Sequence, residues 1–138
     1  MRLDTAFLIK FLQFACIGGV VFLFDASCFW LLIKLTGWPS LARVISVALA
    51  ITLSWALNRA LTFRRQAGRA DWRELLKFAA SQLPGACINA GASLLAFHSL
   101  PFTQNNAWLS TAVGSIAGLF ANFIMANFFV FNKKNMTR

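Results

Sequence analysis

Long apolar runs separated by short charged segments make up most of this sequence. The runs cover residues 11–33, 41–63, 78–100 and 107–131. A helix needs about 20 mostly apolar residues to cross the hydrocarbon of a bilayer, so each run predicts one transmembrane helix. The expected fold class is an all-α membrane protein, with four transmembrane helices in a single domain over residues 1–138.

The connections between the runs carry the turn and charge signals. Gly37-Trp38-Pro39 predicts a tight turn, and a second break begins at Pro101. Between the second and third runs lies a basic loop, residues 64–77, in which Asp71–Lys77 is expected to form one or two amphipathic turns along the membrane surface. This loop divides the chain into two halves of two helices each.

Composition and charge support a membrane location. The chain is 59% hydrophobic and 12% charged, too apolar for a soluble domain that covers itself with polar side chains. Its net charge of +9 would suit nucleic acid. The basic residues, however, stand at the ends of the apolar runs. At these positions they keep the loops on the cytoplasmic side and contact anionic lipid head groups. We therefore expect membrane lipids, and not nucleic acid, as partners.

The distribution of basic residues predicts the topology. Of the thirteen Lys and Arg residues, all but Lys34 and Arg43 lie on the side of the two termini and the central loop, including Lys133, Lys134 and Arg138 in the tail. The positive-inside rule places that side in the cytoplasm. A bias this large favours one orientation, so an inverted dimer is not expected.

The two halves resemble each other weakly in sequence. Ile9-Lys10-Phe11 matches Leu76-Lys77-Phe78 at the start of each half, and Thr62-Phe63 resembles Val130-Phe131 at the end. Two crossings return the chain to the same side, so the halves are predicted to be parallel repeats.

Small and polar residues recur at a spacing of four in three of the predicted helices, which keeps them on one helix face. Such faces let helix backbones approach closely, so they are expected in the bundle interior or a dimer contact. Helix packing is favoured for them over a substrate path. The residues are Ser46, Ala50, Ser54 and Asn58; Ser81, Gly85, Asn89 and Ser93; and Ser110, Gly114, Gly118 and Asn122.

Asp25 is the strongest single indication of function. It is the only charged residue in the first run, and a carboxylate in hydrocarbon must be paired, hydrated or protonated. It predicts a cation or proton site, or a partner for an arginine; the plainer interpretation is a structural hydrogen bond to Asn89, Asn122 or a backbone group. Gly18 lies seven residues earlier, on nearly the same face, and leaves room for a neighbour.

Arginines near the ends of the second run are candidates for phosphate binding, because guanidinium groups bind phosphoryl oxygens through two hydrogen bonds. Arg59, next to Asn58, lies at the inner end, and Arg43 lies near the outer end. The loop arginines are better explained by topology alone. A single His and the absence of paired carboxylates predict no metal site, and no catalytic motif is present, so neither a cofactor nor enzyme activity is expected.

Several short motifs are similar to those of the GtrA-like family of small four-helix membrane proteins. They are Phe14–Gly18 with Asp25, Asn58-Arg59-Ala-Leu-Thr62-Phe63, Lys77-Phe78, Asn122-Phe123 and Val130-Phe131. The resemblance covers nearly the whole chain. Carried over by position, it implies roles for Gly18, Asp25, Asn58, Arg59, Phe63, Asn122 and Phe123. The second half differs, with Asn127 where Arg59 stands and Ala92 where Asp25 stands, so a dimer would have to supply a second set.

The resemblance implies movement of a polyprenyl-phosphate-linked monosaccharide across the bacterial inner membrane, in cooperation with a partner glycosyltransferase. In that hypothesis Arg59, beside Asn58, holds the phosphate inside, Asp25 binds sugar hydroxyls or a proton, and Arg43 receives the phosphate outside. A lateral groove lined by the Ser, Asn and Gly faces, in which Asn89 and Asn122 are expected to contact the substrate, shields the head group. Four helices enclose little volume, so a parallel homodimer is expected. The alternatives are a non-transporting scaffold for a glycosyltransferase and a proton-coupled efflux carrier for small cations.

Overall fold

The computed structural model describes residues 5–67, 69–104 and 107–131, and every element in them is helical. The chain divides into two compact units, Met1–Ala67 and Gly68–Arg138. The boundary lies in the basic loop, where the sequence separates the two halves. The basic tail with Lys133, Lys134 and Arg138 lies outside the described residues.

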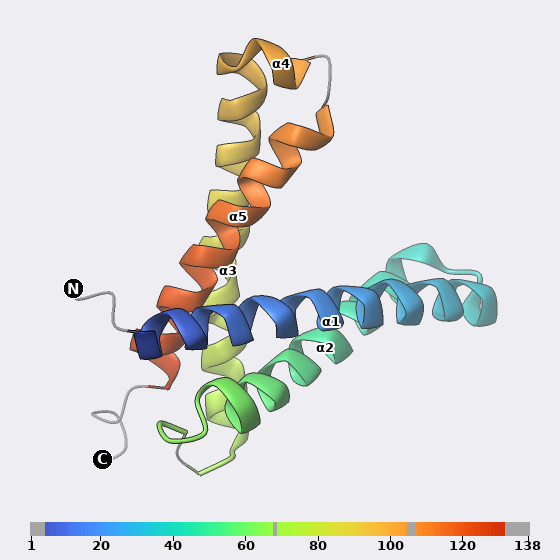
Figure 1. The fold of residues 1–138 in the computed structure, drawn as a ribbon. Helices are drawn as coiled ribbons and strands as arrows, with labels where there is room; N and C mark the ends of the chain where they lie inside the picture. Colours follow the sequence, from blue (N-terminus) through green and yellow to red (C-terminus); the bar gives the residue numbers. More distant parts are fainter. Residues whose placement is uncertain (1–4, 68, 105–106, 132–138) are drawn as a thin grey trace. The chain divides into compact units, whose positions relative to one another are not determined.

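The first unit, unit 1, is a hairpin of two long helices (Figure 1). Helix α1 spans Thr5–Thr36 and α2 spans Pro39–Leu57, continuing into a five-residue π-helix, η1, over Asn58–Thr62. Gly37 makes the turn with a positive φ of 68°, a conformation that glycine adopts without strain. Helix α2 begins at Pro39. Proline is favoured at the first position of a helix, because the N–H that it lacks would have no partner within the helix.

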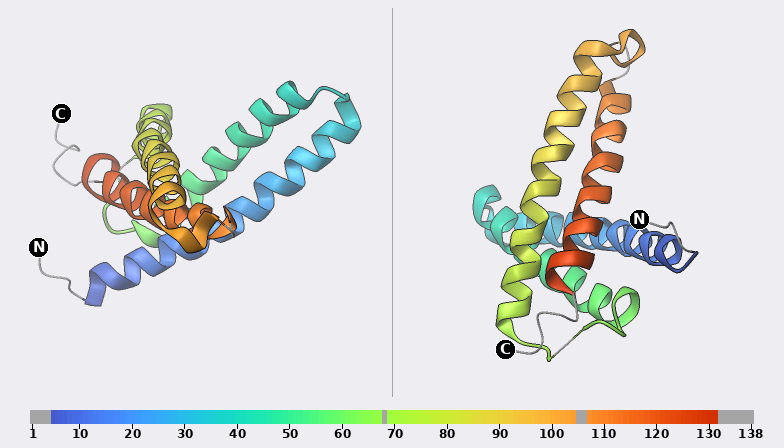
Figure 2. Two further views of the ribbon diagram at one scale, coloured as in Figure 1. Left: turned by 90° about the horizontal axis from the view of Figure 1, so that it is seen from above. Right: turned by 90° about the vertical axis from the view of Figure 1, so that its left-hand side faces the viewer.

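The second unit, unit 2, is also a helical hairpin, and its two long helices run side by side (Figure 2). Helix α3 spans Trp72–Ser99, the short α4 spans Pro101–Gln104, and α5 spans Ala107–Met125 before a second π-helix, η2, over Ala126–Val130. Each unit therefore ends its second long helix in a π-helix.

Helix α3 begins at Trp72 and not at Phe78, because Asp71 caps it. The Asp71 side chain accepts a hydrogen bond of 2.8 Å from the backbone N–H of Glu74. The segment from Asp71 to Lys77, expected as separate turns on the membrane surface, instead forms the cap and first turns of α3. The basic loop expected over residues 64–77 is correspondingly shorter.

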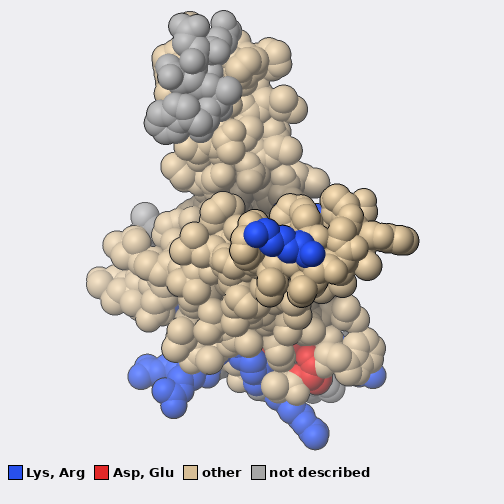
Figure 3. Space-filling view, turned by 90° about the vertical axis from the view of Figure 1, so that its right-hand side faces the viewer, with Lys and Arg blue, Asp and Glu red and all other residues tan. Residues whose placement is uncertain are grey.

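The protein is an all-helical membrane protein. Among the described residues, three helical segments are long and apolar enough to cross a bilayer: Thr5–Thr36, Pro39–Thr62 and Leu109–Val130. Charged side chains are sparse on the face drawn in Figure 3. The third predicted span, 78–100, corresponds to α3, which ends at Ser99. This helix has 28 residues but is less apolar, because polar side chains follow one of its faces.

Each unit closes its core with a pair of phenylalanine rings. In unit 1 the rings of Phe14 and Phe63 meet edge to face at 6.4 Å, and in unit 2 the rings of Phe78 and Phe131 lie 6.1 Å apart. Both Phe63 and Phe131 directly follow a π-helix and are fully buried. The weak sequence repeat thus corresponds to a repeated structure.

Small residues bring α3 and α5 into close contact in unit 2. A Cβ added to Gly118 would lie 2.7 Å from the carbonyl oxygen of Gly85 and 2.8 Å from the Cβ of Asn89. One added to Gly85 would meet the side chain of Asn122, and one added to Gly114 would meet Ser93 and Asn89. The two small-residue faces therefore pack against each other, as close packing of membrane helices requires.

Gly118→Ala is expected to destabilise the protein by about 1–3 kcal/mol, because the added methyl group meets backbone that cannot move aside easily. The measurement is the thermal unfolding midpoint in detergent. Gly91→Ala is the matched control: it lies on α3 with nothing within 4 Å of an added Cβ. It should leave stability unchanged or raise it by up to about 1 kcal/mol. Equal midpoints for the two variants would contradict the close α3–α5 contact.

Candidate functional site

Asp25 of α1 and Arg43 of α2 form an ion pair inside unit 1. An Oδ2 atom of Asp25 lies 2.8 Å from the Nη1 of Arg43, which donates a hydrogen bond to it. At 1.5 Å per residue the 32-residue α1 is about 48 Å long, more than enough to cross about 30 Å of hydrocarbon, and Asp25 lies in the central part of this helix. Of the interpretations weighed for Asp25, the structure shows pairing with an arginine.

The two partners of this pair differ in exposure. The side chain of Asp25 is 17% exposed, whereas that of Arg43 is 54% exposed, and the Arg43 guanidinium lies 5.4 Å from the ring of Phe29. The second carboxylate oxygen of Asp25, Oδ1, is buried and has no hydrogen-bond partner among the described residues. The pair thus combines an accessible guanidinium with an unused buried acceptor.

Two further predicted site residues, Asn58 and Arg59, lie in η1, where α2 ends. Asn58 begins η1 and is 1% exposed, and its Nδ2 donates to the backbone oxygen of Ser54 at 2.9 Å. Arg59 is half-buried, with its guanidinium carbon 5.9 Å from the centre of the Trp55 ring. Lys10, near the start of α1, donates a 2.9 Å hydrogen bond to Gln66, which ties this end of the hairpin together.

Arg43 and Asn58 mark two polar positions on one helix. They are 15 residues apart, which at 1.5 Å per residue is about 22 Å along the helix axis. The structure therefore joins Asp25 with Arg43 at one position and Asn58 with Arg59 at the other, and it keeps these two positions apart.

Asn89 and Asn122 lie in unit 2, at its glycine contacts. Asn89 packs against Gly114 and Gly118, and its Oδ1 accepts a 3.3 Å hydrogen bond from Ser93. Asn122 packs against Gly85, and its Oδ1 is buried with no partner among the described residues. Their geometry favours helix packing over substrate binding. Gly18, predicted to give room near Asp25, is half-buried on α1.

Thr62 was not selected as a site residue in the sequence, although it lies in a matched motif. It ends η1, is 4% exposed, and its Oγ1 has no partner among the described residues. A threonine in a helix normally bonds the carbonyl four residues earlier. Nothing in the composition of this segment indicates a π-helix or a hydroxyl without a partner, so only the proximity of Asn58 in sequence could have drawn attention to Thr62.

Arg43→Gln is expected to destabilise the protein more than the double variant Asp25→Asn with Arg43→Gln. The single change leaves a carboxylate in an apolar setting without its partner, whereas the double change leaves two neutral amides. A double-mutant cycle of thermal or denaturant unfolding in detergent measures the coupling. Since Arg43 is half-exposed, we expect about 1 kcal/mol. Additive effects of the single variants would contradict a stabilising pair.

Comparison with known proteins identifies the family. The family model described as GtrA/DPMS, transmembrane domain, matches residues 13–136, nearly the whole chain and both units. No curated protein matches the sequence. The matched range includes the Asp25–Arg43 pair and both π-helices. The chain belongs to the GtrA/DPMS transmembrane-domain family.

Proposed function

We propose that this protein moves a polyprenyl-phosphate-linked monosaccharide across the bacterial inner membrane, for the synthesis or modification of a cell-surface polysaccharide. Membership of the GtrA/DPMS family supports the broader role, the handling of lipid-linked sugars in polysaccharide synthesis. Transport, rather than catalysis, is the proposed activity. The observation that carries it is the Asp25–Arg43 ion pair within the membrane-spanning helices.

The pair fits the chemical problem of the substrate. A phosphate and a sugar must cross about 30 Å of hydrocarbon, in which every polar group needs a partner supplied by protein. Arg43 offers an accessible guanidinium, and phosphate binds such a group as well as a carboxylate does. In the proposed cycle the substrate phosphate takes the place of Asp25 on Arg43, and sugar hydroxyls donate to the released carboxylate.

Arg59, in η1 at the inner end of this hairpin, provides the second phosphate position. It lies 16 residues after Arg43, about 24 Å along the helix axis, so the α2–η1 segment presents a guanidinium near each end. The proposed phosphate path runs from Arg59 to Arg43. The isoprenoid chain stays in the surrounding lipid throughout.

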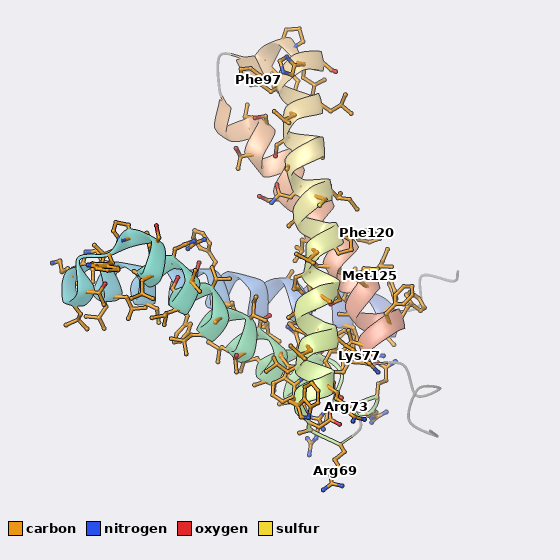
Figure 4. The ribbon with its side chains drawn as sticks, turned by 180° about the vertical axis from the view of Figure 1, so that it is seen from behind. Arg69, Arg73, Lys77, Phe97, Phe120 and Met125 are labelled. Carbon is orange, nitrogen blue, oxygen red and sulfur yellow. The ribbon has the colours of Figure 1, made fainter. Side chains whose placement is uncertain are left out.

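The cytoplasmic side offers a surface for a partner glycosyltransferase. Arg69, Arg73 and Lys77 lie at the start of α3, the end opposite Phe97 (Figure 4), and all three are exposed. In this proposal the termini and the loop face the cytoplasm, and an enzyme with an acidic surface delivers its lipid-linked product there. A parallel homodimer, expected because four helices enclose little volume, is part of this proposal.

The ion pair also separates this proposal from its alternatives. An efflux carrier for small cations needs a carboxylate available to the cation, but Asp25 is already neutralised by Arg43. A scaffold that only recruits a glycosyltransferase through its basic residues has no need of an intramembrane ion pair. Such a scaffold should tolerate Asp25→Asn and fail when the basic residues of the loop are replaced.

Purified protein in proteoliposomes should move a short-chain polyprenyl-phosphate sugar between leaflets faster than empty liposomes do. Arg59→Ala and Asp25→Ala should each reduce the rate at least tenfold, because each removes a group that holds the head group during transfer. Leaflet reorientation is followed by accessibility of the sugar to an external oxidant or enzyme.

Arg69→Ala is the matched control for Arg59→Ala, since it removes an exposed arginine outside the helical spans. It should keep the wild-type rate. Full activity in both Arg59→Ala and Asp25→Ala would refute the roles proposed for these residues. No movement by folded, correctly oriented wild-type protein would favour the scaffold.

A further inference from the structure

The chain contains two π-helices in equivalent places. In η1 the N–H of Phe63 donates to the carbonyl oxygen of Asn58 at 2.8 Å, and in η2 the N–H of Phe131 donates to that of Ala126 at 3.0 Å. Each bond spans five residues, and each ends at a buried phenylalanine. The two elements thus have the same backbone design, which makes one a control for the other.

Their buried side chains differ in polarity. In η1 the first and fifth positions are Asn58 and Thr62, and in η2 they are Ala126 and Val130. All four residues are buried. Since η2 forms with apolar residues at these positions, the π-helix itself does not require Asn58 and Thr62. Their polarity needs another explanation.

The Thr62 hydroxyl, at the end of η1, lacks the partner that other helical hydroxyls of this chain have. On α1 and α2 the hydroxyls of Ser27, Thr36 and Thr52 each donate to the carbonyl four residues earlier, all at 2.8 Å. For Thr62 that carbonyl belongs to Asn58, which accepts the π-helical bond from Phe63, and the hydroxyl does not bond it. The Thr62 Oγ1 is buried with no partner among the described residues.

The orientation of the Asn58 amide is determined by its contacts. Its Nδ2 donates to the backbone oxygen of Ser54, which only accepts, so the remaining atom is the Oδ1 acceptor. That Oδ1 is also buried without a partner among the described residues. It needs a hydrogen-bond donor, and an ionised phosphate has none. Asn58 therefore does not suit the phosphate that was expected beside Arg59.

The charges in unit 1 disfavour a cation as the missing partner. Within its described residues, 5–67, Asp25 is the single carboxylate, and it pairs with Arg43. Arg59 follows Asn58 directly, and Arg64 and Arg65 follow the π-helix. A cation would meet like charges here, whereas a neutral hydroxyl would not.

The geometry points to Asn58 and Thr62 as a subsite for the sugar hydroxyls of the lipid-linked substrate, beside Arg59, which holds the phosphate. This inference rests on the proposed function. It assigns the sugar and the phosphate of the head group to different, neighbouring residues. A sugar hydroxyl donates to Asn58 Oδ1, and a second hydroxyl bonds Thr62 Oγ1. Both atoms are buried in this structure, so neighbouring side chains must move before a substrate reaches them.

The test compares binding of two lipids to the full-length protein in nanodiscs: a short-chain polyprenyl phosphate, and the same lipid carrying glucose, galactose or mannose in turn. Wild type should bind at least one sugar lipid more tightly than the bare phosphate, by roughly 10- to 100-fold for two added hydrogen bonds. Thr62→Val should reduce this preference roughly tenfold, and Thr62→Val with Asn58→Leu should abolish it, while both keep affinity for the bare phosphate.

Two further measurements separate a subsite from a structural role. Thr62→Val should not lower the thermal midpoint, because it removes a buried hydroxyl that has no partner. It also gives η1 a valine at its fifth position, as η2 has with Val130. Thr52→Val, whose hydroxyl is exposed and bonded to Ala48, should leave the sugar preference unchanged.

Four outcomes would overturn the inference. They are equal affinity of wild type for all lipids, an undiminished preference in the double variant, an equal loss for both kinds of lipid with a lowered thermal midpoint, and a loss of preference in Thr52→Val. Equal wild-type affinities would leave the proposed transport intact, provided that flipping is observed. Binding of neither lipid by wild type would remove the proposed function together with the subsite.

Discussion

Hydrocarbon offers no hydrogen-bond partners, so each polar side chain in the membrane-spanning helices must find its partner within the protein. Each unit meets this constraint in its own way. Unit 2 packs its asparagines and serines into the glycine contacts between α3 and α5. Unit 1 pairs Asp25 with Arg43 across its two helices. The polar face of α3, which is less apolar, lies against α5.

The helices and their small-residue faces follow from local patterns, which is why the sequence was sufficient to predict them. Apolar runs of more than 20 residues indicate spans regardless of what they pack against. A spacing of four brings Gly114 and Gly118 onto one face. Small residues on one face let the backbone of a neighbouring helix approach closely, so such a face indicates a helix–helix contact. The early start of α3 also had a signal, since Asp71 followed by Glu74 three residues later resembles a capping pattern.

Tertiary pairings and π-helices could not be predicted in this way. Both Arg43 and Arg59 were available to Asp25, and choosing between them requires the geometry of the hairpin. The hydrogen bonds of a π-helix join residues five apart, one more than in an α-helix. The segments Asn58–Thr62 and Ala126–Val130 have different residues at all five positions, so no shared pattern indicates the π-helix. As a result, the absence of a partner for Thr62 is visible only in the structure.

The two units also differ in which of their polar groups are already engaged. In unit 2 the backbone carbonyl of Gly85 and the Asn89 side chain leave no room for even a methyl group at Gly118. Helices α3 and α5 therefore cannot separate without losing this close packing. In unit 1 the ties between α1 and the α2–η1 segment are made by side chains, the Asp25–Arg43 pair and the Phe14–Phe63 rings. Side chains can change rotamer while the backbone stays in place. If a head group passes through this protein, unit 1 is where the helices can admit it. Buried oxygens of Asp25, Asn58 and Thr62 have no partner there among the described residues, whereas unit 2 has one such oxygen, Oδ1 of Asn122, at its contact with Gly85.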